Sequence, residues 1–433
     1  MSSLFNTEGA WMVLTAAATN SACALVGCYL VLRRMSLMGD ALSHAVLPGL
    51  ALAFIVSGRM FGAENAYSIG PLLVGAVAAG LLTTFLTQTL HEYAGVPADA
   101  SMGVVFTALF ALGVVLIKMG IQGVHFDVAC VYQGTLEFTP YDRWDIFGYD
   151  LPRALVVTGG VLLLNAAVIF ALWKELKLSS FDPALATTMG FSAGLMHYIL
   201  MGLVAITSTA SFEAVGSILV VAMLIIPPAA AHLLADRLGP MMLIAVAIGI
   251  LAAVLGYVMG VWFDTNLAGM MTVAAAGLYF LAVLFSPRHG LVSTLIRNMQ
   301  VATRVVREDL LAMLYRVEEL GSQRRLTRAE AGAAVGGGLL ARLSLSELLR
   351  GGQVAAAGDR LDLTPAGREQ ARQLVRSHRL WETYLHRYLG LPLDHIHEPA
   401  HRVEHFIDEQ MREQLQEELK TVPTDPHGRE IPE

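Results

Sequence analysis

The sequence predicts a mainly α-helical protein in two parts. The first is a polytopic transmembrane body of eight or nine helices; the second is soluble and combines a winged helix (α+β) with a helical domain. Residues 1–286 carry only 9 of the 29 Lys and Arg and 15 of the 36 Asp and Glu. Several of their apolar runs exceed the roughly 18 to 20 residues that cross a bilayer. Charged residues concentrate after residue 286, as in a soluble domain.

Nine apolar runs are expected to cross the membrane, and one of them is a candidate for a re-entrant segment. The runs are 11–32, 41–57, 70–90, 101–117, 154–173, 191–212, 214–231, 240–263 and 265–286. The first lacks the basic start and small-residue cleavage site of a signal peptide, so we expect it to stay in the membrane. The charged connection 120–152 is the least defined part of this topology, and it is a second place for a re-entrant helix.

Basic residues favour a cytosolic C-terminal domain. With nine crossings, the inside set outnumbers the outside set by six to four: Arg33, Arg34, Lys174, Lys177, Arg237 and Arg288 against Arg59, Lys118, Arg143 and Arg153. Three cysteines, two of them inside an apolar run, suggest neither a disulfide framework nor a thiolate metal site.

An ionisable pair stands at the entrance to the second run. Asp40 and His44 are four residues apart, so on a helix they share a face and offer one carboxylate and one imidazole to a divalent cation. Pro48 and Gly49 should loosen the helix one turn later. From these residues alone, a pair that merely satisfies itself at the membrane edge is an equal alternative.

The string 35-MSLMGDALSHAVLPG-49 closely resembles the signature of ABC-type permeases that import manganese, zinc or ferrous iron, and segments 181–192 and 212–238 extend the resemblance. It implies that Asp40 and His44 line the transport path and bind the metal. It also implies a multi-pass protein of the bacterial inner membrane. The partners would be an ABC ATPase subunit, an extracytoplasmic metal-binding protein and a second permease, the same or homologous.

The prolines and charged residues of segment 212–238 predict a local structure without reference to any family. Pro227 and Pro228 are expected to interrupt a transmembrane run, and a short amphipathic helix ending at Asp236, Arg237 and Gly239 should follow. The resemblance makes it the ATPase-coupling segment, with Pro227, Pro228, His232, Asp236 and Arg237; an ordinary interfacial helix is the alternative. We expect His232 to be interfacial and not a ligand.

No phosphate-cradling G-x-x-x-x-G-K-[ST] string occurs in the chain, so we expect it to bind no nucleotide and not to be an enzyme. ATP hydrolysis would belong to a separate subunit. Four further residues could touch a permeating cation, but we favour loop or cap roles for them: His125, Asp127, Glu213 and Asp264.

Three segments are expected after the membrane body. Residues 287–302 form a linker or juxtamembrane helix, in which Arg288 and Arg297, with Arg304 just beyond, would meet anionic lipid headgroups. Residues 303–368 form a degenerate winged helix, and 369–433 a helical metal-binding and dimerisation domain. Within 359–385 the pattern predicts a wing strand, a Thr-Pro helix start and a long helix.

Histidines and carboxylates in the last segment have the spacing of metal ligands. His401, Glu404 and His405 fall on one helical face, and His378 and Glu382 on another. Nitrogen and oxygen donors without cysteine favour Mn²⁺, Fe²⁺ or Zn²⁺. For any single histidine a solvated polar surface is the simpler reading, but the set as a whole favours metal.

Residues 303–433 also resemble the diphtheria-toxin-repressor-like family of metal-dependent regulators, through LTPAGR, HRLWE, HEPAHRVEH and DPHGREIP. The resemblance implies these metal ligands: His378, Glu382, His397, His401, Glu404 and His405. Asp309 matches a ligand of the manganese-responsive members, which favours Mn²⁺. His401 replaces a usual Cys or Glu, and Ala312 replaces a carboxylate of the manganese-responsive members.

The DNA-reading part of that family is altered here. Three glycines, Gly336 to Gly338, replace the polar turn and the start of the recognition helix, and only Arg342, Ser344 and Ser346 remain to donate to DNA. We therefore expect no DNA binding. The sequence predicts a divalent-metal import permease whose appended domain senses cytosolic metal. The alternatives are a membrane-tethered metal-dependent transcription regulator and a purely structural appendage.

Overall fold

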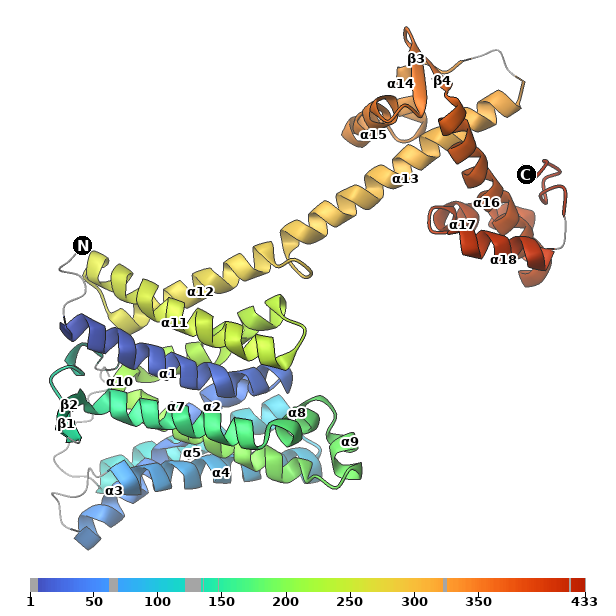
Figure 1. Ribbon diagram of the computed structural model, residues 1–433. Coiled ribbons are helices and arrows are strands. Elements are labelled where there is room, and N and C mark those ends of the chain that lie inside the picture. Colours follow the sequence, from blue (N-terminus) through green and yellow to red (C-terminus); the bar gives the residue numbers. More distant parts are fainter. Residues whose placement is uncertain are drawn as a thin grey trace. The chain divides into compact units, whose positions relative to one another are not determined.

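The computed structural model describes residues 7–61, 69–120, 134, 136–146, 148–321, 325–419 and 422–432. The chain divides into two compact units, Met1–Ser293 and Thr294–Glu433 (Figure 1). Each unit has a hydrophobic core of its own.

The first unit is a bundle of apolar helices. Within the described residues, nine segments are long and apolar enough to cross a membrane, and each overlaps one of the nine expected runs. The helices are α1 (Thr7–Leu32), α2 (Ser36–Ala45), α3 (Leu47–Phe61), α4 (Ile69–Ala94), α5 (Ala98–Gly120), α7 (Arg153–Ala171), α8 (Trp173–Phe181), α9 (Pro183–Thr188), α10 (Ala193–Leu234), α11 (Leu238–Phe263) and α12 (Leu267–Phe285).

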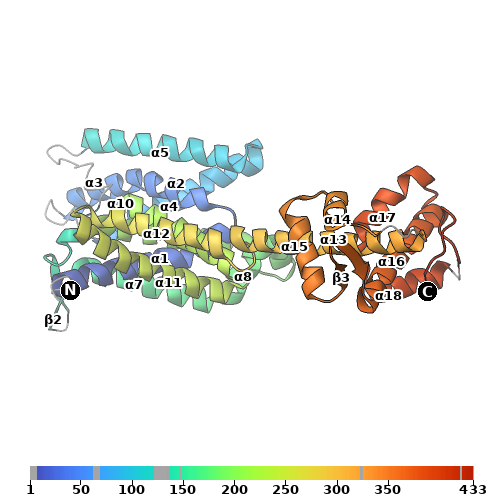
Figure 2. The ribbon, with the colours of Figure 1, turned by 90° about the horizontal axis from the view of Figure 1, so that it is seen from above.

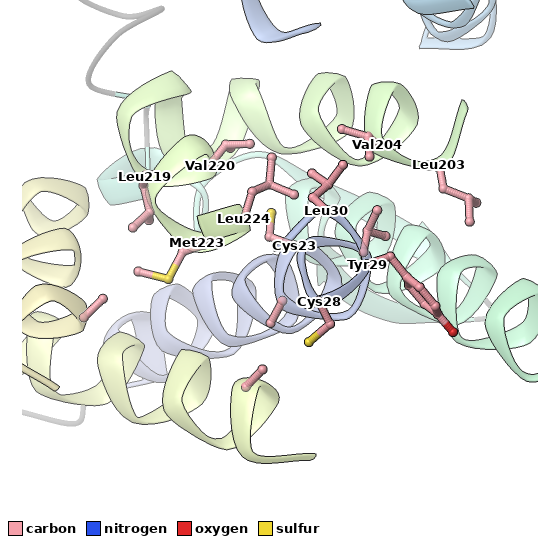
Figure 3. Close-up of a cluster of buried hydrophobic side chains, with 14 of the residues drawn as sticks. Cys23, Cys28, Tyr29, Leu30, Leu203, Val204, Leu219, Val220, Met223 and Leu224 are labelled. Atoms are coloured by element: carbon pink, nitrogen blue, oxygen red, sulfur yellow. The ribbon is translucent and has the colours of Figure 1, made fainter. Parts of the chain in front are cut away.

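Helix α1 lies at the centre of this bundle and packs against α7, α10 and α11 (Figures 1 and 2). Its side chains interdigitate with those of α10 in the close-up of the core (Figure 3). At Gly27 a Cβ atom would lie 2.1 Å from the carbonyl oxygen of Leu224, so only glycine lets α1 and α10 approach this closely. In lipid there is no hydrophobic driving force between helices, so their association relies on close van der Waals packing. Small residues at a crossing allow this packing.

Helix α10 changes direction at Gly216 and not at the prolines. Gly216 has φ 75° and ψ 163°, which divides α10 into two membrane-spanning halves. Pro227 and Pro228 lie buried inside the second half, so the expectation that they interrupt the run is wrong. A helix packed inside a protein bundle tolerates proline because neighbouring groups and small adjustments compensate for the lost backbone bonds.

The second span is broken, as the Pro48-Gly49 pair predicts. Helix α2 ends at Ala45 and α3 begins at Leu47, with Pro48 in its first turn, where a missing N–H costs least. At Gly49 a Cβ atom would lie 2.1 Å from the carbonyl oxygen of Gly75 on α4. The break is therefore stabilised by a close α3–α4 crossing.

The connection between α5 and α7 contains a feature that the sequence did not predict. A short 3₁₀ turn (Leu136–Phe138) leads to an antiparallel hairpin of β1 (Arg143–Ile146) and β2 (Tyr149–Pro152). The re-entrant helix proposed for this connection falls mainly on residues outside the described ranges.

The second unit contains a winged helix followed by a helical domain. Its elements are α13 (Leu291–Glu319), α14 (Arg328–Ala334), α15 (Gly338–Arg350), β3 (Val354–Ala357), β4 (Arg360–Leu363), α16 (Pro365–Leu389), a 3₁₀ turn (Leu393–His395), α17 (His397–Glu404) and α18 (Glu409–Leu419). The strands β3 and β4 pair as the wing. The expected Thr-Pro helix start is confirmed, because the Thr364 hydroxyl accepts from the Gly367 N–H and Pro365 opens α16.

Candidate metal centres

Two groups of metal-ligating side chains meet in the second unit. Cluster 1 consists of His378, Glu382 and His397; cluster 2 consists of Asp309, His401, Glu404 and His405. In each cluster every residue offers a ligand atom within 4.8 Å of all the others. All seven ligands that the sequence predicts are thereby brought into two sites.

Cluster 1 joins α16 to the first turn of α17. His378 and Glu382, one turn apart on the buried face of α16, place Nε2 and Oε1 3.0 Å from each other. Nδ1 of His397 lies 2.9 Å from the same Oε1 and 3.1 Å from Nε2 of His378. Two imidazole nitrogens and a carboxylate oxygen thus converge on one point.

Cluster 2 joins α17 to α13. Nε2 of His405 lies 3.3 Å from Oδ1 of Asp309, and Nε2 of His401 lies 3.9 Å from the same oxygen. Oε1 of Glu404 is 2.8 Å from Nδ1 of His401 and 3.8 Å from Nε2 of His405. Asp309 is the only ligand in the described clusters that α13 provides.

The donor atoms fit a divalent cation. Nδ1 of His378 and Oε2 of Glu404 lie 2.6 Å apart, yet they are not aligned for a hydrogen bond and have no other partner. Nε2 of His405 is also buried without a hydrogen bond. Buried polar atoms without hydrogen bonds are costly, and a cation in cluster 2 would satisfy Nε2 of His405. The Glu404 carboxylate beside Nδ1 of His378 would hold that ring with Nε2 toward cluster 1. Nitrogen and carboxylate donors without a thiolate suit Mn²⁺, Fe²⁺ or Zn²⁺.

The charges in the two clusters are strongly coupled. Burial opposes the charged form of Glu382, but His378 and His397 lower the pKa of this carboxyl to about 2. Burial likewise opposes protonation of His405, while Asp309 and Glu308 raise its pKa to about 9. The pKa of His378 is also raised, against the effect of burial, by Glu382 and Glu404. In the absence of metal, protons on His378 and His405 balance the carboxylates, and a metal ion bound at these rings must displace protons.

Two neighbours of these clusters were missed in the sequence. Oε2 of Glu308 lies 2.8 Å from Nδ1 of His405, where it fixes the ring so that Nε2 faces Asp309. Nε2 of His427, in the C-terminal DPHGREIP block, lies 4.0 Å from Oε1 of Glu382. Glu308 could have been found as the carboxylate adjacent to Asp309. The contact of His427 depends on a fold-back of the tail that no local pattern indicates.

The predicted transport pair lies on α2. Nε2 of His44 and Oδ1 of Asp40 are 3.5 Å apart, and the two side chains are 30% and 46% exposed. The His44 ring meets Phe110 of α5 edge-on, with ring centroids 5.6 Å apart. Within the described residues no third His, Cys, Asp or Glu joins this pair as a ligand. One chain therefore offers an open, two-ligand site.

We call the end of the bundle that carries the α10–α11 connection the joint end. Of the residues expected to couple to an ATPase, His232, Asp236 and Arg237 lie there. A groove of about 290 Å³ there is lined by Leu32, Phe181, His232, Leu233, Ala235, Asp236, Arg237, Leu238, Met241 and His289. The expected separate amphipathic helix is absent from this described stretch. Helix α10 runs to Leu234, a three-residue connection follows, and Gly239 already belongs to α11. Pro227 and Pro228 lie buried in α10 and do not line the groove.

Other candidates take the following places. His125 and Asp127 lie outside the described residues, as does the side chain of Glu213. Asp264 is the left-handed C-cap of α11, in agreement with a cap role. Among the arginines expected at lipid headgroups, Arg288 forms an ion pair with Asp236 and Arg304 one with Glu308, while Arg297 is exposed.

The helix-turn-helix region is altered as the glycines suggest. Gly336, Gly337 and Gly338 all have positive φ, and α15 starts at the last of them. The Ser344 hydroxyl is buried and donates to the carbonyl of Thr303, so it does not face a ligand. Exposed positions on α15 include Leu339, which is 70% exposed.

Comparison with known proteins agrees with this two-part architecture. Residues 9–286 match the family model "ABC 3 transport family", and residues 364–433 match "Iron dependent repressor, metal binding and dimerisation domain". The latter match does not include the winged helix. The relationship to a repressor domain does not support the expectation that the chain binds no DNA.

Individual relatives cover the first unit. The manganese transport system membrane protein MntD of Bacillus subtilis is 42% identical over 67% of this chain and 97% of its own length. The zinc transport system membrane protein TroD of Treponema pallidum is 39% identical over 65% and 75%. The solved structure of PsaBC from Streptococcus pneumoniae in complex with Fab aligns with a TM-score of 0.54 and 30% identity, covering 64% of this chain and 92% of that one.

The nine long apolar segments found among the described residues, together with these permease relatives, make the chain a multi-pass membrane protein. Since the family model spans 278 consecutive residues, from 9 to 286, the chain belongs to the ABC 3 transport family.

Proposed function

We propose that this chain is the permease subunit of an ATP-driven importer of a divalent transition metal, with Mn²⁺ as the first choice and Zn²⁺ or Fe²⁺ as alternatives. The observation that carries the proposal is the Asp40–His44 pair, set on a broken helix inside a body that belongs to a transport family. Ionisable groups within a membrane span are costly and are retained for function. The names of the relatives support manganese or zinc.

The path would be completed by a second permease. Asp40 and His44 provide two ligands, whereas Mn²⁺ and Zn²⁺ take four to six, and both side chains are partly exposed in the single chain. A second copy or a homologous permease that brings an equivalent pair would close the site. An extracytoplasmic metal-binding protein would deliver the ion at the end of the bundle that carries the β1–β2 hairpin.

Energy would come from a separate ATPase subunit bound at the joint end, which we place on the cytosolic side. The short helix α9 and its flanks expose Phe181, Leu185 and Met189 there, 58%, 46% and 60% exposed. Asp236, Arg237 and His232 line the adjacent groove, which supports their expected role in coupling. Pro227 and Pro228 would act only indirectly, through the second half of α10.

The second unit would regulate transport by sensing cytosolic metal. A cation bound in these clusters supplies the positive charge that draws their carboxylates and histidines together. Cluster 2 would then hold α17 against α13 through Asp309, and cluster 1 would hold α17 against α16. We propose that this ordering slows uptake when metal is plentiful. Manganese suits the oxygen-rich cluster 2, which contains two carboxylates.

A second candidate function is a membrane-tethered, metal-dependent transcription regulator, favoured by the similarity of residues 364–433 to a repressor domain. It requires sequence-specific DNA binding by the winged helix. The exposed Leu339 and the internally bonded Ser344 on α15 count against it.

The proposed transport is tested by uptake of radioactive manganese into cells that express the chain with its ATPase. Asp40→Asn and His44→Ala should each reduce uptake at least tenfold, because each removes a ligand atom from the path. Asp99→Asn, at an exposed carboxylate in the first turn of α5, is the matched control and should leave uptake unchanged. Full uptake by both path variants would refute the assignment.

A further inference from the structure

The first unit ends in a hydrogen-bonded turn that follows α12. We call the segment Ser286–Ser293 the joint. The carbonyl of Ser286 accepts hydrogen bonds from the Gly290 N–H at 3.0 Å and from the Ser293 hydroxyl at 2.8 Å. A Cβ atom at Gly290 would lie 2.4 Å from the Ser286 carbonyl oxygen, so the turn can close only with glycine there. Ser286 is fully buried.

The joint is fastened to the connection between α10 and α11. The Ser286 hydroxyl donates to the carbonyl of Leu233 over 2.6 Å, and this buried bond satisfies one of the last carbonyls of α10. Arg288 forms an ion pair with Asp236 just beyond it. Both charged side chains are largely exposed, so the buried hydroxyl bond contributes most of the attachment and the ion pair adds little.

As a result, the joint takes part in the groove at the joint end. His289 lines that groove together with Asp236, Arg237 and Phe181. After Phe181 in the chain, the short helix α9 and its C-cap expose Leu185 and Met189. Phe181 thus lines the mostly apolar groove and precedes the exposed apolar residues Leu185 and Met189, which we call the α9 strip.

We propose that the joint forms one wall of the surface on which the ATPase subunit is seated, with His289 and Arg288 contacting that subunit beside Phe181. The inference rests on the proposed function, in which this end binds an ATPase. Three observations favour this occupant over lipid or a second copy. The chain has no phosphate-binding loop of its own. The strip lies on the short helix α9 between two spans. The groove combines charged and aromatic side chains, as protein interfaces do.

Helix α13 contains both the last residues of the joint and a ligand of a metal cluster. The helix begins within the joint, at Leu291, and provides Asp309 to cluster 2 further along.

The test is site-specific photocrosslinking in the complete transporter, permease with ATPase, in lipid nanodiscs. Native Cys23, Cys28 and Cys130 are first replaced by serine or alanine, and transport by this background is verified. A benzophenone label is then attached at His289→Cys, at Leu185→Cys as a probe of the α9 strip, and at Tyr149→Cys. Tyr149 is 72% exposed on the β1–β2 hairpin and serves as the negative control.

We expect crosslinks to the ATPase from positions 289 and 185 and none from 149. A crosslink from 185 alone would overturn the inference about the joint while leaving ATPase binding at this end intact. Crosslinks from neither 289 nor 185 would overturn both the inference and the proposed ATPase site. A crosslink from 289 alone would support the joint and refute docking on α9. If position 289 crosslinks to lipid or to a second permease and not to the ATPase, the proposed occupant is wrong.

Discussion

Oε2 of Glu404 lies 2.6 Å from Nδ1 of His378, while Oε1 of the same carboxylate faces His401 and His405. Glu404 therefore contacts both clusters: Oε1 is a ligand atom of cluster 2, and Oε2 lies against His378 of cluster 1. Its side chain is only 3% exposed, so the carboxylate is shielded from bulk solvent. This shared carboxylate makes the two clusters parts of one centre.

Replacing the shared carboxylate should weaken both clusters together. In Glu404→Gln the amide loses its negative charge and one oxygen, so we expect manganese affinity to fall by about 10- to 100-fold or more, with no cluster spared. Isothermal titration calorimetry on the purified full-length protein measures this directly. Glu398→Gln, on the same helix but exposed and paired with Arg402, is the control and should bind as the wild type does. Loss of only one of two binding events would contradict the shared role.

Metal binding should strengthen as the pH rises from 6.5 toward 9. Carboxylates of Glu308, Asp309 and Glu404 face His405 and raise its pKa to about 9, so near neutral pH a proton occupies the ring that must bind metal. Each pH unit below that pKa should reduce affinity by up to about tenfold per displaced proton. Affinity that stays constant between pH 6.5 and 8.5 would show that His405 is not a ligand.

The stability of the metal-free protein should change in the opposite direction. A raised folded-state pKa means that protonated His405 stabilises the fold fully below its ordinary pKa of 6.5, and that this contribution is lost as the pH rises through about 9. Thermal unfolding of the second unit's transition, followed in chelator from pH 6.5 to 9, measures the loss. Glu308→Gln removes one of the facing carboxylates and should move the loss to lower pH; an unmoved profile would exclude the Glu308–His405 contact.

The broken second span depends on the crossing of Gly49 and Gly75. Gly49→Ala places a methyl group 2.1 Å from a backbone carbonyl oxygen, so we expect a loss of about 1–3 kcal/mol of stability and a lower melting temperature in detergent. Gly103→Ala is the matched control: the position is helical with nothing within 4 Å, and alanine there should be neutral or stabilising by up to about 1 kcal/mol. Equal melting temperatures for the two variants would contradict the close crossing.

The altered winged helix should not read DNA. Arg342 is exposed, but Ser344 donates to Thr303, and the glycine turn leaves Leu339 at the exposed start of α15. We expect footprinting on the promoter regions of metal-uptake genes to show no protection by the full-length protein, with or without manganese. Manganese-dependent protection of a defined site would favour the tethered transcription regulator.

The sequence predicts the spans and the metal ligands well because both have local signals. In the part of the chain that the structure describes, each of the nine apolar runs overlaps a helical segment long and apolar enough to cross a membrane. Ligands at helical spacing, such as His378 and Glu382, meet as their spacing requires. The break after Ala45 and the Thr364 helix start also follow from local chemistry.

Features that depend on tertiary packing could not be read in this way. Pro227 and Pro228 suggest an interruption, but the bundle accommodates them and places the reversal at Gly216, whose positive φ leaves no mark in the sequence. The approach of His427 to Glu382 and the attachment of Ser286 to Leu233 join residues 45 and 53 positions apart. No periodicity predicts such contacts.

The measurement that tests the account most directly is manganese uptake in a reconstituted transporter, with free manganese on the ATPase side held at chosen levels. Wild type should transport at low metal and slow as metal on that side rises. Glu404→Gln should transport at an undiminished rate at every level, and Asp40→Asn should not transport at any. Two results would contradict the proposal that this metal permease is regulated by its own metal-binding unit. One is a wild-type transport rate that does not change with the manganese concentration on the ATPase side; the other is full transport by Asp40→Asn.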